Sequence, residues 1–183
     1  MKKIIILFSG EGFNAQNIVK ELHQKKCEVV CAITNKKDAK GIERLKALSI
    51  NTQVLEHINF QTREAFDAEL VKVINSYKPD LVVLSGFMRI LTSVFTENIN
   101  AINLHPSLLP KHKGANAIEK SFASDDAKAG VSVHYVSNEL DGGKIILQKS
   151  FIRDAKESYE SFCVKIKQIE LEILPKAILA EII

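Results

Sequence analysis

The sequence predicts a doubly wound α/β fold with a mostly parallel sheet, and two observations support this prediction. Short β-branched segments alternate with longer segments of helical period over the first hundred residues. The strand segments are continuous apolar runs, which is typical of parallel strands buried on both faces. We expect strands at Ile4–Phe8, Val29–Thr34, Thr52–Leu55, Leu81–Leu84 and Ala101–Leu104. We expect helices between them at Asn14–Lys25, Gly41–Leu48 and Thr62–Tyr77.

The pattern changes after residue 110. A short helix is expected at Ala115–Ser124, and Asp141-Gly142-Gly143 is a strong turn signal. That turn joins two expected strands, Gly130–Val136 and Lys144–Phe151, which should pair as antiparallel neighbours. A long amphipathic C-terminal helix follows, which Pro175 should kink or shorten. Its apolar positions recur at spacings of three and four residues, at Tyr159, Phe162, Ile166, Ile169 and Ile173.

Length and charge limit the classes of protein to consider. A chain of 183 residues suggests one domain over residues 1–183. Its 46% hydrophobic and 26% charged residues are ordinary for a globular protein and exclude a disordered chain. The 25 lysines and arginines exceed the 22 aspartates and glutamates by three, without a basic tail or stripe. We therefore expect no nucleic-acid partner.

The cysteines and the N-terminus indicate the compartment. Cys27, Cys31 and Cys163 form neither a disulfide framework nor a paired metal motif, which points to a reducing environment. The apolar run Ile4–Phe8 is shorter than the roughly 7–15 residues of a signal sequence. No apolar run approaches the roughly 18 residues that span a bilayer. We expect a cytoplasmic protein with no membrane partner, either a monomer or a homodimer.

Ligands of an open parallel sheet bind outside the carboxyl ends of its strands. After the first strand, Ser9–Asn14 contains two glycines whose backbone N–H groups can approach an anion at a helix N-terminus. The segment matches neither the dinucleotide fingerprint nor the P-loop. A phosphate cradle is one interpretation, and a plain turn in which Asn14 caps the helix is the other.

The segment after the fourth strand, Ser85–Leu91, is unusually apolar for a loop. It suits an apolar slot for a flat ligand, with Arg89 near the acidic end of that ligand. It also suits a plug of the hydrophobic core, and the segment alone favours the plug.

The fifth strand ends in a pair of polar residues. Asn103 and His105 are two apart and project from the same face of a strand. An amide donor beside an imidazole suits an oxyanion site with a proton shuttle. Asp141 is the best candidate for a carboxylate that raises the pKa of His105, although a turn role alone would also explain it. With no metal-ligand spacing and no serine elbow, the sequence predicts metal-free chemistry at a carbonyl.

On these residues, the sequence resembles the folate-dependent formyltransferases, and among them the branch that acts on glycinamide ribonucleotide. The resemblance extends from the first strand to the last helix. Its most specific mark is Asn103–Pro110 (Asn-Leu-His-Pro-Ser-Leu-Leu-Pro) followed later by Asp141-Gly142-Gly143. Further marks are Gly10–Asn14, Thr62–Asp67, Gly86–Leu91 and Ser132–Tyr135.

The resemblance implies a Rossmann-like formyltransferase fold and roles for individual residues. Gly12, Phe13 and Asn14 would hold the substrate phosphate, and Glu170 would contact the same ribonucleotide. The residues that would surround the folate are Arg63, Met88, Arg89, Ile90, Leu91, Asn103, Glu139, Leu140 and Asp141. The apolar loop then becomes a pterin slot rather than a plug. The domain would comprise a phosphate-binding half, residues 1–100, and a catalytic and folate-binding half, residues 101–183.

The reaction that the resemblance implies is a direct formyl transfer without a metal. The donor is the co-substrate 10-formyltetrahydrofolate and the acceptor is the amine of glycinamide ribonucleotide, a step of de novo purine synthesis. Asn103 and a protonated His105 would stabilise the tetrahedral oxyanion. Asp141 would keep His105 protonated.

Three features depart from the family pattern. Phe13 stands where a small serine is common, and Lys111–Gly114 replaces the usual Lys-aromatic-Pro-Gly. The chain also stops at Ile183, where many relatives continue. None of these departures affects Asn103, His105 or Asp141.

Three other functions are considered. Methionyl-tRNA formyltransferase carries a further C-terminal domain for tRNA, for which 183 residues leave no space. Formyltetrahydrofolate hydrolase carries an N-terminal regulatory domain, whereas here the sheet is expected to start at Lys2. A catalytically silent nucleotide-binding module would keep the fold, but the intact Asn103, His105 and Asp141 argue against it.

Overall fold

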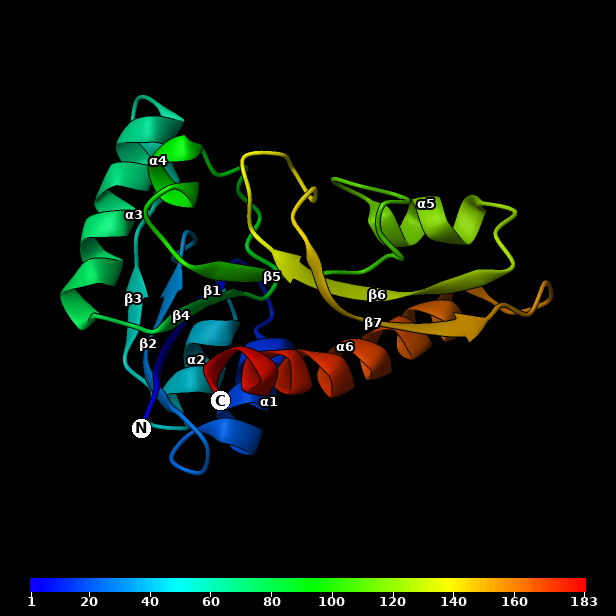
Figure 1. Cartoon of the computed structure of the whole chain (residues 1–183), viewed down its shortest axis with the longest axis horizontal. Helices are drawn as coiled ribbons and strands as arrows, with labels where there is room; N and C mark the ends of the chain where they lie inside the picture. The colour runs from blue at the N-terminus through cyan, green and yellow to red at the C-terminus, as the bar shows by residue number, and fades with distance from the viewer.

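The computed structural model describes residues 1–183 as a seven-stranded sheet with helices on both faces (Figure 1). The strands are β1 Lys3–Phe8, β2 Glu28–Thr34, β3 Thr52–Val54, β4 Leu81–Leu84, β5 Ala101–His105, β6 Lys128–Tyr135 and β7 Ile145–Ile152. Their order is β3-β2-β1-β4-β5-β6-β7, and the first five pair in parallel. β6 and β7 run antiparallel, so the predicted fold class is confirmed.

The helices follow the predicted sequence of elements. They are α1 Phe13–Leu22, α2 Gly41–Lys46, α3 Arg63–Tyr77, α4 Ser93–Thr96, α5 Ala117–Ala123 and α6 Tyr159–Ile182, with a 3₁₀ turn η1 at His57–Asn59. α1 ends at Leu22 rather than at the predicted Lys25, because Gln24 takes a left-handed conformation (φ 58°). α4 and η1 were not expected, because single turns carry no periodic signal.

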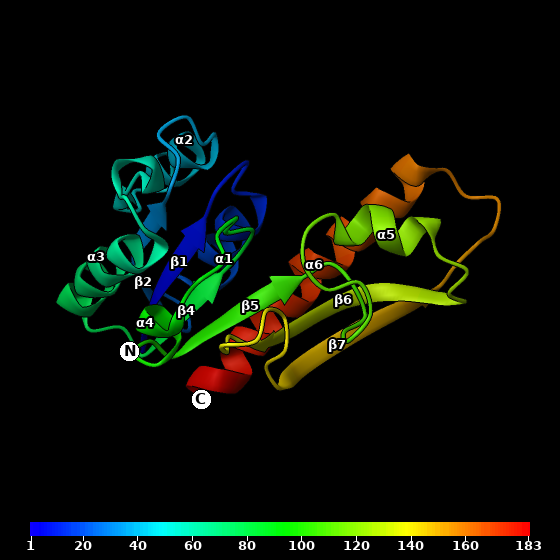
Figure 2. The ribbon, with the colours of Figure 1, turned by 90° about the horizontal axis from the view of Figure 1, so that it is seen from above.

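Alternation along the parallel strands divides the core into two layers. Ile4, Ile6 and Phe8 of β1 face the layer that contains α1, α2 and α6. Ile5 and Leu7 face the opposite layer, which contains α3 and α4. Seen from above, β1, β4 and β5 point in the same direction, and the β6–β7 hairpin extends beyond them along α6 (Figure 2). The carboxyl ends of the parallel strands therefore open on one side of the molecule.

The strand order reverses between β1 and β4, which is the point where open α/β sheets bind ligands. The loops that leave these two strands are hydrogen-bonded to each other there. The Ser9 N–H donates to the Gly86 carbonyl (3.0 Å), and the Met88 N–H donates to Ser9 Oγ (2.8 Å). The two loops therefore enter the crevice as one unit.

Helix α6 runs through Pro175 to Ile182, so of the two expected effects of Pro175, a kink or a shortening, the shortening does not occur. Proline has no N–H, and the carbonyl four residues earlier, that of Leu171, loses its helical donor. Asn17 of α1 supplies a replacement, because its Nδ2 donates to the Leu171 carbonyl at 2.8 Å. A side chain from the neighbouring helix thus replaces the backbone hydrogen bond that the proline removes; we call this replacement the repair of α6.

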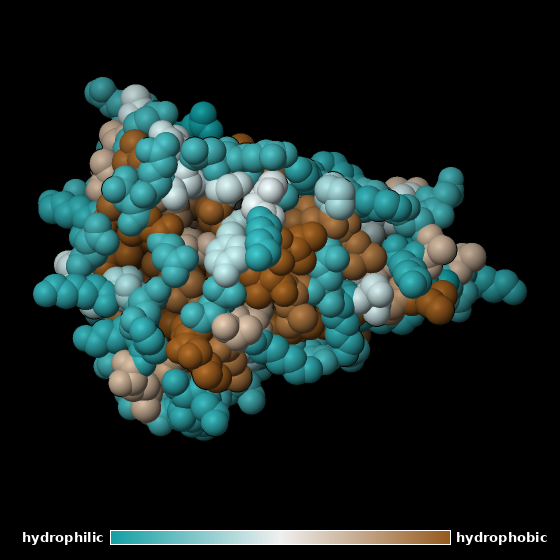
Figure 3. All heavy atoms as spheres, viewed as in Figure 1, coloured by the Kyte–Doolittle hydropathy of each residue, from teal (hydrophilic) through white to brown (hydrophobic).

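The surface mixes charged and apolar side chains. Hydrophilic residues cover most of the face in Figure 3, with apolar patches in its middle and over the C-terminal end of α6. Ile183, at that end, is 98% exposed. None of the helices combines the length and the apolarity that crossing a bilayer requires.

The repair of α6 predicts a coupled effect on stability. Asn17→Ala leaves the Leu171 carbonyl without its donor and should lower the free energy of unfolding by about 1–3 kcal/mol. Pro175→Ala restores a backbone N–H, so the same substitution should cost clearly less in that background. Urea unfolding of the four proteins of this double-mutant cycle measures the coupling. Equal losses in both backgrounds would contradict the repair.

Candidate active site

The polar residues at the end of β5 meet the turn between β6 and β7. Asn103 and His105 project from β5, and the turn brings Asp141 over them with its side chain 7% exposed. Asp141 Oδ2 lies 3.4 Å from His105 Nδ1, and Asn103 Nδ2 donates weakly to Asp141 Oδ1 at 3.5 Å. Residues separated by 38 positions in the sequence thus form one cluster.

His134 is a fourth member of this cluster; the sequence marked the segment Ser132–Tyr135 that contains it but gave His134 no role. It lies on β6 directly opposite Asn103 in the antiparallel pairing and is 2% exposed. Its Nδ1–H donates to the Tyr135 carbonyl (2.8 Å), which leaves Nε2 as an acceptor for Asn103 Nδ2 (3.1 Å). His134 therefore fixes the orientation of the Asn103 amide. The strand register was the signal that could have revealed it.

The loop Lys111–Gly114 closes the cluster from above with two main-chain hydrogen bonds. The His112 carbonyl contacts His105 Nε2 at 2.9 Å, and the Gly114 N–H donates to Asp141 Oδ2 at 2.8 Å. Asp126 anchors the loop through Lys111 and through His112 Nε2 (2.9 Å). These two partners, Lys111 foremost, lower the pKa of Asp126 to about 2. The loop that departs from the family pattern is thus held by its own ion pairs.

The protonation of the central pair differs from the expectation. Burial lowers the pKa of His105, and it outweighs the His112 carbonyl and the Asp141 charge, which both raise it. For Asp141, burial raises the pKa, but the neighbouring imidazoles of His134 and His105 and the hydrogen bond from the Gly114 N–H together bring it below its ordinary value. Asp141 is therefore a carboxylate, but its charge does not suffice to keep His105 protonated at neutral pH.

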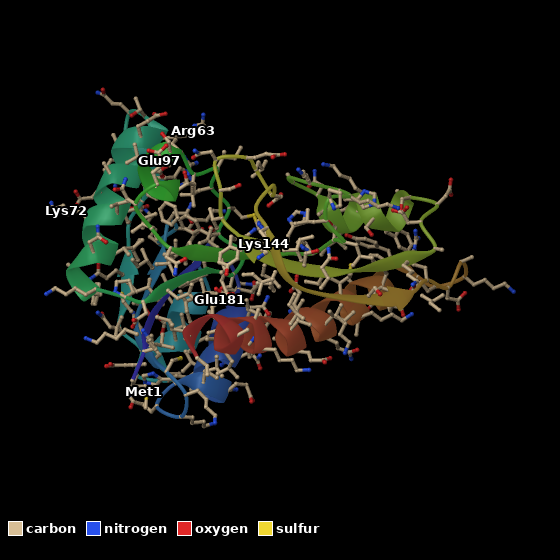
Figure 4. The ribbon with its side chains drawn as sticks, viewed as in Figure 1. Met1, Arg63, Lys72, Glu97, Lys144 and Glu181 are labelled. Atoms are coloured by element: carbon tan, nitrogen blue, oxygen red, sulfur yellow. The ribbon has the colours of Figure 1, made fainter.

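An apolar cavity of about 580 Å³ opens beside the cluster. Every predicted folate residue except Arg63 lines it: Met88, Arg89, Ile90, Leu91, Asn103, Glu139, Leu140 and Asp141. Arg63 lies exposed at the start of α3 (Figure 4) and is absent from the lining of this cavity and of its neighbour.

The loop after β4 both fills the hydrophobic core and lines the apolar cavity, the two alternatives that the sequence left open for it. Phe87 is 7% exposed and belongs to the core layer of α3, whereas Met88 is 70% and Ile90 53% exposed at the cavity. Asp67 of α3 holds the end of the loop, because it accepts hydrogen bonds from the backbone N–H (2.6 Å) and the hydroxyl (2.7 Å) of Thr92. The buried ring of Phe87 thus fixes the loop to the core, and the loop places the side chains of Met88 and Ile90 at the cavity.

A second cavity of about 420 Å³ lies over the loop after β1. Gly12 has a φ of 72°, and a Cβ there would lie 2.6 Å from the Gly41 Cα, so only glycine fits. The N–H groups of Phe13 and Asn14 have no acceptor in the chain and point out of the N-terminus of α1. The helix starts without a side-chain cap, so the alternative in which Asn14 caps it is wrong.

Asn14 instead reaches the last helix. Its Nδ2 donates to Glu170 Oε2 at 3.0 Å, and both residues line the second cavity. Burial raises the pKa of Glu170, and it outweighs the hydrogen bond from Asn14 and the charge of Lys167. The two cavities share Gly86, Met88 and Ile118, so they are adjacent. Ligands bound in the two cavities would therefore meet beside these three shared residues.

A doubly wound sheet with a pocket at a helix N-terminus, an apolar slot and an Asn-His-Asp cluster is suited to group transfer at a carbonyl. The chain belongs to the formyl transferase family, whose model matches residues 2–178.

Relatives agree with this membership over almost the whole chain. The sequence is 39% identical to phosphoribosylglycinamide formyltransferase of Escherichia coli over 96% of this chain and 84% of that protein. It is 31% identical to the human trifunctional purine biosynthetic protein adenosine-3, of which it spans 18%. The crystal structure of phosphoribosylglycinamide formyltransferase from Campylobacter jejuni is similar at a TM-score of 0.95 and 51% identity, over 98% of this chain and 96% of that one.

The burial of His105 predicts how its ring titrates. In the folded protein its pKa should lie below the ordinary 6.5, so the unfolded chain takes up this proton first and the contribution to stability falls as the pH drops below that value. Asp141→Asn removes a charge that raises the pKa and should lower it further. Titration of the histidine ring signals by NMR, assigned with His105→Gln, checks both statements. A His105 pKa above 6.5, or an increase in the Asn variant, would contradict them.

Proposed function

We propose that the chain transfers the formyl group of 10-formyltetrahydrofolate to the amine of glycinamide ribonucleotide, giving formylglycinamide ribonucleotide and tetrahydrofolate in purine biosynthesis. The observation that carries the proposal is the Asn103, His105 and Asp141 cluster on the wall of the apolar cavity, which adjoins a second cavity of different character. The names of the relatives agree with it. The cytoplasmic location stays a prediction.

The ribonucleotide fits the cavity over the loop after β1. Free N–H groups of Phe13 and Asn14 and the dipole of α1 suit its phosphate. Glu170, which Asn14 holds, suits a ribose hydroxyl as its partner. The amine would then point toward the shared boundary at Gly86 and Met88.

The folate co-substrate fits the apolar cavity. Exposed Met88 and Ile90 on one side and Leu140 on another form walls suited to a flat ring system. The buried Nε of Arg89 has no partner in the chain, which leaves a donor for a polar group of the ligand. When bound, this co-substrate supplies the formyl carbon at which the amine reacts.

The cluster can stabilise the oxyanion and transfer the proton, the two functions that such a formyl transfer needs. The amine attacks the formyl carbon, the carbonyl oxygen gains charge, and Asn103, oriented by His134, donates a hydrogen bond to that oxygen. The neutral His105 accepts the proton that the attacking amine loses and returns it to the leaving nitrogen. Asp141 stabilises the imidazolium that exists between these two steps.

His105 must exchange one partner for this role. Both of its ring nitrogens face acceptors of the chain itself, the His112 carbonyl at 2.9 Å and Asp141 Oδ2 at 3.4 Å. The carbonyl belongs to the loop Lys111–Gly114, whereas Asp141 is held by three neighbours. We infer that substrate displaces the loop contact and leaves the contact to Asp141 in place.

Substitutions in the cluster should remove turnover without unfolding the protein. His105→Ala and Asp141→Asn should each lower kcat by about 10²–10³, since each removes a group that acts on the reacting atoms or stabilises its charge. Folate absorbance reports loss of the formyl donor after glycinamide ribonucleotide is added. His23→Gln, which alters a histidine at the end of α1, is the matched control and should keep the wild-type rate.

Two outcomes would count against the proposal. Loss of the formyl donor in wild-type protein without the amine substrate would indicate a hydrolase. Near wild-type rates in His105→Ala, with circular dichroism unchanged, would remove the assigned site.

A further inference from the structure

Three polar side chains are hydrogen-bonded in series at the carboxyl ends of β1 and β2, and the reaction described above gives them no role. Ser9 follows β1, Asn35 follows β2, and His57 begins the 3₁₀ turn η1. Ser9 is 3% exposed and Asn35 2%. Polar groups buried to this degree need a partner for each donor and acceptor. The way in which these groups satisfy one another therefore constrains how each is oriented.

The hydrogen bonds among them run in one direction, starting from the loop after β4. The Met88 N–H can only donate, and Ser9 Oγ accepts it at 2.8 Å. The hydroxyl then donates to Asn35 Oδ1 at 2.5 Å, which is the only acceptor that the chain offers it. This orients the Asn35 amide so that its Nδ2 faces His57 Nδ1 at 3.1 Å. His57 is thus the final acceptor of a chain of three hydrogen bonds.

The amide of Asn35 also determines the tautomer of His57. Nδ1 must present a lone pair to the amide, so the ring hydrogen lies on Nε2. The Asn35 carbonyl, 3.3 Å from Nδ1, would suit the other tautomer, but a hydrogen on Nδ1 would then face the hydrogens of Nδ2. Turning the amide over would remove that clash and leave the Ser9 hydroxyl without an acceptor. The chain therefore requires an acceptor at Nδ1 of residue 57.

The other end of the chain is a backbone position of the ligand site. Met88 lines both cavities, and its side chain is 70% exposed there. The loop turns tightly at this point, because Gly86 has a φ of 79° and the Arg89 N–H donates to the Phe87 carbonyl at 2.9 Å. Ser9 Oγ is the only partner of the Met88 N–H. The position of this N–H therefore decides where the Met88 side chain lies on the cavity wall.

We propose that His57 is a positioning residue for the wall of the apolar cavity, and that it acts through Asn35 and Ser9 on the Met88 N–H. The inference rests on the proposed function for the identity of the ligand, 10-formyltetrahydrofolate. Without an acceptor at residue 57, the buried Asn35 Nδ2 loses its partner and the amide no longer has a fixed orientation. Each bond of such a chain strengthens the next, so the loss weakens the hold on Met88.

The ring of His57 also packs against the core, and this contact offers a different explanation for any effect of a substitution. Its centroid lies 6.4 Å from that of Phe66, edge to face at 86°. Phe66 in turn lies under the Arg89 guanidinium, 5.6 Å from its centroid. Two variants separate packing from hydrogen bonding. His57→Phe keeps a ring against Phe66 but removes the acceptor, whereas His57→Asn removes the ring but places an acceptor oxygen where Nδ1 was.

Steady-state kinetics compares these two variants. His57→Phe should raise the KM for 10-formyltetrahydrofolate about 5- to 20-fold, the effect of one lost hydrogen bond, with little change in kcat or in the KM for the ribonucleotide. His57→Asn should keep all three values near those of the wild type. Ile58→Ala, which alters a 72% exposed residue of the same turn, is the matched control and should also change none. Equal increases in the Phe and Asn variants, or no increase in the Phe variant, would overturn the positioning role.

Hydrogen exchange of the Met88 N–H, followed by NMR, tests the chain of hydrogen bonds without any substrate. His57→Phe should speed this exchange about 10-fold, and His57→Asn should leave it near the wild-type rate. The Ser85 N–H, which donates to the Leu7 carbonyl at 2.9 Å, should exchange equally in all three proteins and so reports an intact sheet. If the wild-type protein transfers no formyl group, this measurement still decides the inference. Equal Met88 exchange in the wild-type and Phe proteins would overturn it.

Discussion

The site depends on one buried carboxylate. Asp141 lies near His105 Nδ1 and His134 Nε2 and accepts from Asn103 and the Gly114 N–H. These neighbours come from β5, from β6 and from the loop before α5, so one side chain joins three segments. A buried charge without such partners would cost several kcal/mol, and for that reason the partners and the carboxylate require each other. The turn that presents Asp141, at a φ of 51°, is therefore part of the site rather than a connection.

The sheet provides the frame for this carboxylate. Because the strand order reverses between β1 and β4, their loops diverge to form separate walls, while the hydrogen bond from Ser9 to Gly86 ties them at the base. β5 then adds Asn103 and His105 next to β4, and β6 adds His134 by pairing antiparallel with β5. Because β6 runs antiparallel to β5, its last residue, Tyr135, lies level with Ile102 near the start of β5. The turn after β6 must therefore fold back along the sheet to bring Asp141 to Asn103 and His105.

Much of this arrangement follows from the sequence, for identifiable reasons. Buried parallel strands are continuous apolar runs, and all five expected strands lie within one residue of the observed ones at each end. Asn103, His105 and Asp141 were recognised because a strand end and a tight turn leave marks in the sequence. His134 was not, because its role arises from its register opposite Asn103, which no local pattern encodes. The lowered pKa of His105 was not expected for a related reason, since the burial that lowers it is a property of the folded chain and not of a local segment.

The last helix links the stability of the fold to the cavity over the loop after β1. Three contacts join α1 to α6 along one seam, from Phe13 to Lys167, from Asn14 to Glu170 and from Asn17 to Leu171. The third exists because Pro175 frees a carbonyl, and that carbonyl belongs to the residue directly after Glu170. The proline therefore supplies a fixed point between the two helices next to the cavity. The contact that replaces the missing backbone hydrogen bond of α6 thus lies beside Lys167 and Glu170, the residues of α6 that line the cavity over the loop after β1.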